Sequence, residues 1–141
     1  MPLFDFHRGR RSMTSLVGIK VLVVEDEGAV AMLIEEMLEE LGCEVVASVA
    51  RLATALDVAR HVEADLAMLD VNLAGQFVFP VAEVLRDRAI PFIFSTGYGA
   101  SRIPAEFSEC HILHKPYSES ELRQKITLAA SEAKRQKRSL P

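Results

Sequence analysis

The chain has 141 residues, of which 50% are hydrophobic and 26% charged, which is typical of one soluble globular domain. A net charge of −4 gives no basic field for nucleic acid, and the apolar runs are far shorter than the roughly 20 residues that cross a membrane. The two cysteines, Cys43 and Cys110, lack metal or redox spacing. We therefore expect a cytoplasmic protein with reduced, packing cysteines and with neither nucleic acid nor membrane as a partner.

Three parts are expected along the chain: a flexible leader at 1–17, one folded domain at 18–134 and a basic tail at 135–141. The leader carries Arg8, Arg10 and Arg11 but no apolar segment, which excludes a secretory signal peptide. Basic residues near the end of the chain suit the carboxyl end of a last helix.

Strand-like and helix-like segments alternate five times. The continuous apolar run 19–24 predicts a strand that is buried on both faces. A helix that ends at Gly42 is predicted next. The residues of its apolar face have helical spacing: Val30, Leu33, Ile34, Met37, Leu38 and Leu41. Further strands are predicted at 44–49, 66–69, 91–95 and 111–114, with helices near 52–59 and 80–85.

The sequence signals for the fourth and fifth helices differ in strength. The segment 99–109 is poor in helical periodicity and holds Pro104, so we expect at most a short, weak fourth helix there. Ser118 and Glu121 have the spacing of a capping box, which predicts the start of the last helix. The alternation predicts an α/β fold, a doubly wound five-stranded parallel sheet with helices on both faces.

Five polar residues come at or directly after predicted strand ends: Glu25, Asp26, Asp70, Thr96 and Lys115. The carboxyl ends of parallel strands share one edge of the sheet, so we expect these side chains to meet there. Three carboxylates crowded together repel each other unless a cation joins them. An oxygen-only cluster of this kind suits Mg²⁺, and a carboxylate beside Mg²⁺ indicates phosphoryl chemistry.

In this hypothesis Asp70 is the nucleophile that forms an acyl phosphate. Glu25, Asp26 and Asp70 hold the Mg²⁺ ion, which offsets the negative charge that gathers during transfer. Asn72 lies two residues after Asp70, where its backbone carbonyl can complete the oxygen shell of the metal.

The remaining residues of the hypothesis handle the phosphate. Lys115 supplies a flexible positive charge that pairs with Asp70 or with a phosphate oxygen. The Thr96 hydroxyl bonds a phosphate oxygen, and Gly97 leaves access to the site. The Lys115–Pro116 bond is a candidate cis peptide that would help to aim the lysine.

As a set, these residues make the chain resemble the receiver domain of two-component response regulators, from about residue 19 to residue 133. The resemblance is carried by Val-Leu-Val-Val-Glu25-Asp26-Glu27, Leu69-Asp70-Val71-Asn72, Ser95-Thr96-Gly97 and His114-Lys115-Pro116-Tyr117. The run Pro91-Phe-Ile-Phe-Ser-Thr-Gly-Tyr-Gly99 further resembles the "FAT GUY" subgroup of stand-alone receivers, with Ser95 in place of the usual Ala.

This resemblance implies the flavodoxin-like fold with strand order 2-1-3-4-5, dependence on Mg²⁺, and phosphate transfer to Asp70. The donor it implies is a sensor histidine kinase, of the HWE/HisKA2 type usual for that subgroup, or a phosphotransfer protein. We therefore expect a single-domain response regulator of a two-component or phosphorelay system. It would signal through contacts with a downstream protein and catalyse only its own phosphorylation and dephosphorylation.

One position departs from the family pattern. Most receivers carry Tyr or Phe three residues before the lysine, whereas this chain has Ile112, which cannot move between polar and apolar settings as Tyr can. The relay from Thr96 to this position is therefore in doubt, and we expect the loop 96–103 and the edge of the last helix to carry the signal. Tyr98 either packs on a neighbour or, with the Asn72 side chain, tunes the lifetime of the aspartyl phosphate.

Other functions stay open as alternatives. A Mg²⁺-dependent aspartyl-phosphate phosphohydrolase needs an acid two residues after the nucleophile, where this chain has Asn72. A receiver-like module that binds partners without phosphorylation is a second alternative, and a flavodoxin-like cofactor binder is a third, although no phosphate loop follows the first strand. His111 and His114 lack partners at metal spacing. Phe77 and Phe79 are interpreted as core or as a helix-entry staple, with a surface for a partner as the alternative.

Overall fold

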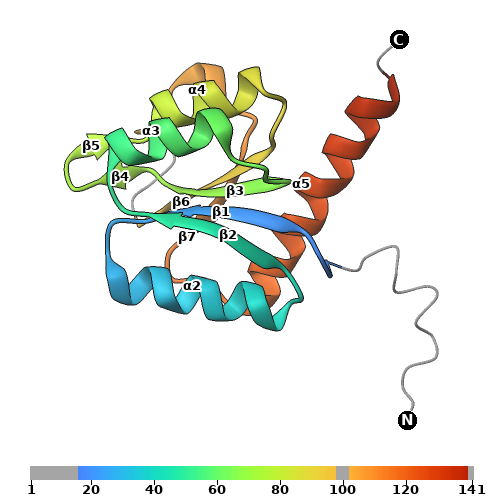
Figure 1. The fold of residues 1–141 in the computed structure, drawn as a ribbon, viewed down its shortest axis with the longest axis horizontal. Coiled ribbons are helices and arrows are strands. Elements are labelled where there is room, and N and C mark those ends of the chain that lie inside the picture. The colour runs from blue at the N-terminus through green and yellow to red at the C-terminus, as the bar shows by residue number, and fades with distance from the viewer. Residues whose placement is uncertain (1–15, 98–101, 140–141) are drawn as a thin grey trace.

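The computed structural model describes residues 16–97 and 102–139. Its centre is a five-stranded parallel sheet with the order β2-β1-β3-β6-β7 (Figure 1). The strands are β1 (Lys20–Val24), β2 (Glu44–Val49), β3 (Leu66–Asp70), β6 (Phe92–Thr96) and β7 (His111–His114). Counted along the chain, this order is 2-1-3-4-5, which confirms the predicted doubly wound, flavodoxin-like topology.

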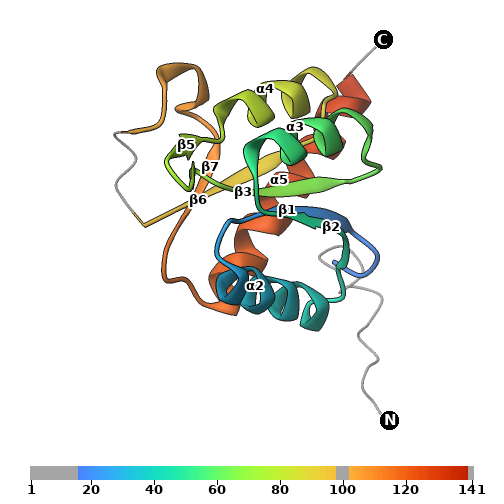
Figure 2. The same ribbon diagram turned by 60° about the vertical axis from the view of Figure 1, so that its left-hand side comes forward.

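Helices cover both faces of the sheet. Helices α3 (Leu52–His61) and α4 (Phe79–Asp87) lie on one face, and α2 (Gly28–Glu40) and α5 (Glu119–Ser139) lie on the other (Figures 1 and 2). The expected weak helix is a single 3₁₀ turn, η2 (Ala105–Phe107). The right-handed crossovers of a parallel sheet produce this two-sided cover.

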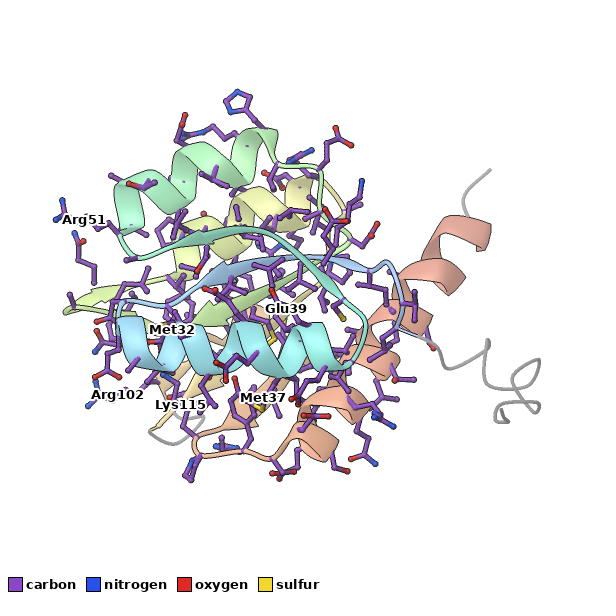
Figure 3. The ribbon with its side chains drawn as sticks, turned by 60° about the horizontal axis from the view of Figure 1, so that its bottom comes forward. Met32, Met37, Glu39, Arg51, Arg102 and Lys115 are labelled. Carbon is purple, nitrogen blue, oxygen red and sulfur yellow. The ribbon has the colours of Figure 1, made fainter. Side chains whose placement is uncertain are left out.

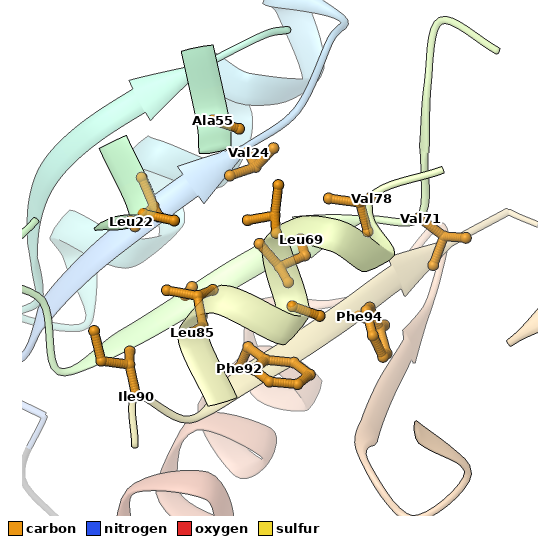
Figure 4. Packing of buried hydrophobic residues seen from close by; sticks show 14 of the residues in the cluster. Leu22, Val24, Ala55, Leu69, Val71, Val78, Leu85, Ile90, Phe92 and Phe94 are labelled. Atoms are coloured by element: carbon orange, nitrogen blue, oxygen red, sulfur yellow. The ribbon is translucent and has the colours of Figure 1, made fainter. Parts of the chain in front are cut away.

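The core on the α3/α4 face is rich in aromatic rings. Strands β1, β3 and β6 contribute Leu22, Val24, Leu69, Phe92 and Phe94 to it (Figure 4). Phe107 of η2 is fully buried, and its ring centroid lies 5.8 Å from that of Phe79 and 5.6 Å from that of Phe94. Of the pair expected in the core or as a staple, Phe79 packs against this cluster, whereas Phe77 is 43% exposed and stacks on Phe79.

The core on the α2/α5 face is aliphatic, and two expectations fail there. Its helical members include Ile34, Leu38, Leu122 and Ile126. Leu33 does not join them, because the buried stripe of α2 (Ala31, Ile34 and Leu38) is narrower than expected and leaves Leu33 55% exposed. Leu16 was assigned to the leader but is buried in this cluster, so the packed part of the chain begins before residue 18.

The ends of the two helices on this face follow local rules. Gly42 comes after the last turn of α2 with φ of +93°, and an added Cβ there would lie 2.9 Å from Val17 Cγ2, so only glycine fits. The Ser118 N–H donates to Glu121 Oε1 at 2.8 Å, and the Glu121 N–H donates to Ser118 Oγ at 3.1 Å, which confirms the capping box. Helix α5 continues through the residues expected to form a basic tail, as far as Ser139.

A short hairpin after β3 was not predicted. It consists of the antiparallel strands β4 (Asn72–Leu73) and β5 (Gln76–Phe77) and lies at the end of the sheet where α2 begins (Figure 1). Its turn residues, Ala74 and Gly75, have φ of 51° and 92°. The Gly75 N–H donates to Asn72 Oδ1 at 2.7 Å, a local bond that favours this turn.

Cys43 is buried and Cys110 half-buried, and both are free thiols as expected.

None of the helices in 16–97 and 102–139 has the length and apolar character needed to span a bilayer.

Arg88 ties α4 to the end of α3. Its Nη1 donates to the carbonyl oxygens of Ala59 and Val62 at 2.8 and 2.9 Å, groups at the carboxyl end of α3. Because Arg88→Ala leaves both carbonyls without this donor, we expect the free energy of unfolding to fall by about 1 kcal/mol in urea denaturation. Arg123→Ala, which removes an exposed guanidinium from α5, serves as the control, and an equal loss in both variants would contradict the assignment.

Candidate active site

The polar residues predicted at strand ends meet at the carboxyl edge of the sheet. Asp70 is the last residue of β3 and is in register with Ser95 of β6. Thr96 ends β6, and its carbonyl oxygen accepts from the N–H of Lys115 at 2.8 Å. The sheet therefore delivers an acid, a hydroxyl and an ammonium group to one edge from segments far apart in the sequence.

Three carboxylates form the core of the site. One oxygen from each of Glu25, Asp26 and Asp70 lies within 4.8 Å of the others, and in the described residues this is the one such group of candidate metal ligands. Glu25 is 2% exposed and Asp70 is 9% exposed, so both are largely removed from water. His111 belongs to another contact, in which its Nε2 lies 2.9 Å from Glu132 Oε1.

Lys115 brings a positive charge to the acids. Its Nζ lies 2.9 Å from Glu25 Oε1 and 3.4 Å from Asp70 Oδ2, and the peptide bond to Pro116 is cis. Figure 3 shows Lys115 near the end of the molecule where α2 begins. Burial acts to lower the pKa of Lys115, but the hydrogen bond with Glu25 and the charge of Asp70 outweigh it and raise the pKa. The lysine therefore stays charged.

One ammonium group does not neutralise three carboxylates. Burial and the charge of Glu25 raise the pKa of Asp70 to about 7, against the lowering effect of Lys115. An ionised Asp70 therefore needs a further positive charge close to it. The donors present are all hard oxygens, the ligands that Mg²⁺ and Ca²⁺ prefer, so the residues fit a divalent cation of this type.

The β4–β5 hairpin closes one side of the site. Asp26 Oδ2 accepts from the N–H of Ala74 at 3.2 Å, so the second acid of the motif holds the hairpin turn. The amide oxygen of Asn72 is bonded to the Gly75 N–H within that turn rather than directed to the acids. The position of Asn72 near the site could be predicted because it comes two residues after Asp70 in the sequence. The hydrogen bond between Asp26 and Ala74 could not be predicted in this way.

The remaining predicted residues lie at the end of β6, in β7 and outside the described part of the chain. Thr96 is 4% exposed, and an added Cβ at Gly97 would meet no described atom within 4 Å, so there is open space at Gly97. Ile112 is half-buried and packs against the α3/α4 core. Tyr98, expected to tune phosphate lifetime, lies outside the described residues.

Two hydroxyl groups at the site were missed. Ser95 and Tyr117 were noted only as parts of motifs, yet both hydroxyl oxygens are buried and neither makes a hydrogen bond within the described part of the chain. The signal was the serine itself, since a polar residue at an inward position of a buried strand needs a partner.

A comparison with protein-family models matches residues 21–127 to the response regulator receiver domain. The chain belongs to this family. Receiver domains are modules of two-component signalling, and the three acids and Lys115 lie in the parts of this receiver domain that carried the resemblance. No match is found among curated proteins.

Solved structures agree with this family. The solution structure of SdrG from Sphingomonas melonis Fr1 is 35% identical with a TM-score of 0.68, over 82% of this chain and 96% of SdrG. The response regulator PhyR from Brucella abortus is 26% identical with a TM-score of 0.76, over 94% of this chain but 56% of PhyR. This receiver domain therefore spans little more than half the length of that protein.

A further neighbour carries a metal. The receiver domain of the sensor histidine kinase PA1611 from Pseudomonas aeruginosa PAO1 has a magnesium ion coordinated in its active-site cleft. It is 24% identical with a TM-score of 0.70, over 82% of this chain and 99% of that one, so the likeness concerns the fold.

The raised pKa of Asp70 predicts a dependence of stability on pH. Between about 3.8 and about 7 the folded state binds more protons at this carboxyl than the unfolded state does, so metal-free stability falls as pH rises through this window. We expect Asp70→Asn to be more stable than wild type at pH 8 in chelator, by on the order of 1 kcal/mol, with the gap closing toward pH 4.

Urea denaturation across this pH range measures the gap. Asp57→Asn, which neutralises an exposed acid on α3, is the matched control and should follow wild type. A gap for Asp70→Asn that does not vary with pH would contradict the assignment.

Proposed function

We propose that this chain is a single-domain response regulator that accepts a phosphoryl group on Asp70 in a Mg²⁺-dependent reaction and signals through protein contacts. The main support is the arrangement of Asp70, which shares a cluster with two other acids and has the Lys115 ammonium 3.4 Å from its Oδ2. An acid in this setting can act as a nucleophile while its surroundings take up the charge of a phosphoryl group.

In the proposed reaction a carboxylate oxygen of Asp70 attacks the phosphorus of the donor. The new O–P bond forms as the bond from phosphorus to the leaving group breaks, and that group keeps the electron pair. The leaving atom is a histidine nitrogen when a kinase or phosphotransfer protein is the donor, and an acetate oxygen when acetyl phosphate is used. We assign Lys115 and the Thr96 hydroxyl to the phosphoryl oxygens, with Gly97 leaving room for them.

We assign the metal site to Glu25, Asp26 and Asp70, with the backbone carbonyl of Asn72 as a further oxygen. When bound, Mg²⁺ offsets the negative charge between the carboxylate and the phosphoryl group. The magnesium ion in the receiver domain of PA1611 supports the choice of metal.

The donor we propose is a sensor histidine kinase, of the HWE/HisKA2 type, or a phosphotransfer protein. The kinase type rests on the resemblance of 91–99 to the "FAT GUY" motif. A cytoplasmic location and a downstream protein partner follow from the same proposal, because the phosphoryl donor and the output of such a relay are both proteins.

Phosphorylation can be tested directly. After incubation with acetyl phosphate and Mg²⁺, intact mass measurement should show one added phosphoryl group on wild type and none on Asp70→Asn, since the amide cannot form the acyl phosphate. Asp57→Asn should be labelled like wild type. Equal labelling of Asp70→Asn would contradict the assignment of the acceptor.

The same reaction separates the alternatives. Rapid release of phosphate over many turnovers without accumulation of the phosphorylated chain would favour the phosphohydrolase, although Asn72 carries no proton for a general acid. A wild-type chain that stays unlabelled would favour the module that works without phosphorylation.

Binding of Mg²⁺ can be tested separately, by thermal unfolding. In chelator-free buffer at pH 8, Mg²⁺ should raise the thermal midpoint of wild type, because an ion that binds the folded state alone stabilises it. Asp26→Asn should lose most of this increase, whereas Glu36→Gln, an exposed acid of α2, should keep it. A full increase in Asp26→Asn would contradict its role as a ligand.

A further inference from the structure

The hydroxyl groups of Ser95 and Tyr117 are buried and have no hydrogen-bond partner in the described residues. Ser95 is 2% exposed. Burial raises the pKa of Tyr117 to about 12, and the Ser95 side chain lies within interaction range and opposes that increase, but the two hydroxyls do not have the geometry of a hydrogen bond. A buried pair of donors and acceptors left unmatched is unusual in a folded protein and needs an explanation.

Both residues are attached to the active site. Ser95 is in register with Asp70 on the neighbouring strand, and Tyr117 is two residues after Lys115. The charges of Glu25 and Asp70 also raise the pKa of Tyr117, which indicates that the phenol lies within electrostatic reach of both carboxylates. A change of charge at Asp70 therefore acts on this hydroxyl directly.

Lys115 can couple the charge at Asp70 to the position of Tyr117. It follows β7, and its Nζ contacts Glu25 beyond β1, across the ends of β6 and β3. Neighbouring strands are about 4.8 Å apart, so this contact requires the side chain to extend across the edge of the sheet. A phosphoryl group on Asp70 offers anionic oxygens beside β3, and a shorter reach would relax the segment that leads from Lys115 to Tyr117.

Tyr117 is joined directly to α5. Ser118 caps this helix through its two hydrogen bonds with Glu121, and its carbonyl oxygen accepts from the N–H of Leu122 at 3.0 Å. Leu122 is fully buried in the α2/α5 core. A shift of Tyr117 is therefore passed to the cap and the first turn of α5.

We propose that the Tyr117 and Ser95 hydroxyls pair when Asp70 is phosphorylated, and that this bond transmits the state of the site to the first turn of α5. This inference rests on the proposed function of Asp70 and supplies the readout that Ile112, an aliphatic side chain, cannot provide. Ser95 and Tyr117 act as positioning residues, since neither contacts the reacting atoms.

Hydrogen exchange on the full chain tests the transmission. With acetyl phosphate and Mg²⁺, exchange at the amides of 118–122 should slow in wild type. In Tyr117→Phe, which keeps the ring and loses the hydroxyl, and in Ser95→Ala, the slowing should fall to the baseline of Asp70→Asn treated in the same way. Thr127→Val, which removes a hydroxyl from α5 away from the site, should respond like wild type.

A spectroscopic readout separates hydrogen bonding from simple packing. The chain has two tyrosines and no tryptophan, so protein labelled with ¹³C at the tyrosine ring gives two phenol carbon signals, and the one that remains in Tyr98→Phe belongs to Tyr117. This signal should shift on phosphorylation in wild type and stay in place in Ser95→Ala.

The outcomes distinguish this inference from the function on which it rests. If mass measurement shows wild type unlabelled, the proposed function fails and the inference fails with it. If wild type and Ser95→Ala are both labelled and both slow exchange at 118–122 equally, the inference alone is overturned. If Tyr117→Phe does not fold, Ser95→Ala and the ¹³C signal decide the question in the same way.

Discussion

The balance of charge at the carboxyl edge of the sheet governs the rest of this molecule. Three carboxylates converge there because β1 and β3, the strands that lead to them, end at the same edge, and the Lys115 ammonium lies 2.9 Å from Glu25 and 3.4 Å from Asp70. The strands that carry the acids are buried on both faces, so water cannot screen the repulsion fully. The fold thus holds buried acids close together, and burial and the charge of Glu25 raise the pKa of Asp70.

The parts of the fold that follow from local chemistry could be predicted from the sequence. Short segments rich in apolar residues located the five strands, and the spacing of Ser118 and Glu121 located the start of α5. Because parallel strands share one edge, these elements were sufficient to bring Asp26, Asp70 and Lys115 together. The family resemblance then supplied the strand order.

What the sequence could not predict depends on contacts between distant segments. Two-residue strands such as β4 and β5 have no periodicity to detect, and their hairpin is held by Asp26 from another strand. Leu33 fits a helical stripe but faces outward, since the width of the covered stripe is set by the sheet rather than by α2. The Ser95–Tyr117 pair joins two motifs that look independent until β6 and the start of α5 lie side by side.

The sheet also separates the interior into two compartments that share no buried side chain. The aromatic compartment sits under α3, α4 and η2, and the aliphatic one under α2 and α5. Because close-packed interiors accommodate changes in volume locally, repacking one compartment leaves the other intact. Evolution can therefore change the α3/α4 layer of such a protein, for instance to fit a new binding partner, while the segment that carries Lys115 and helix α5 after it keep their geometry.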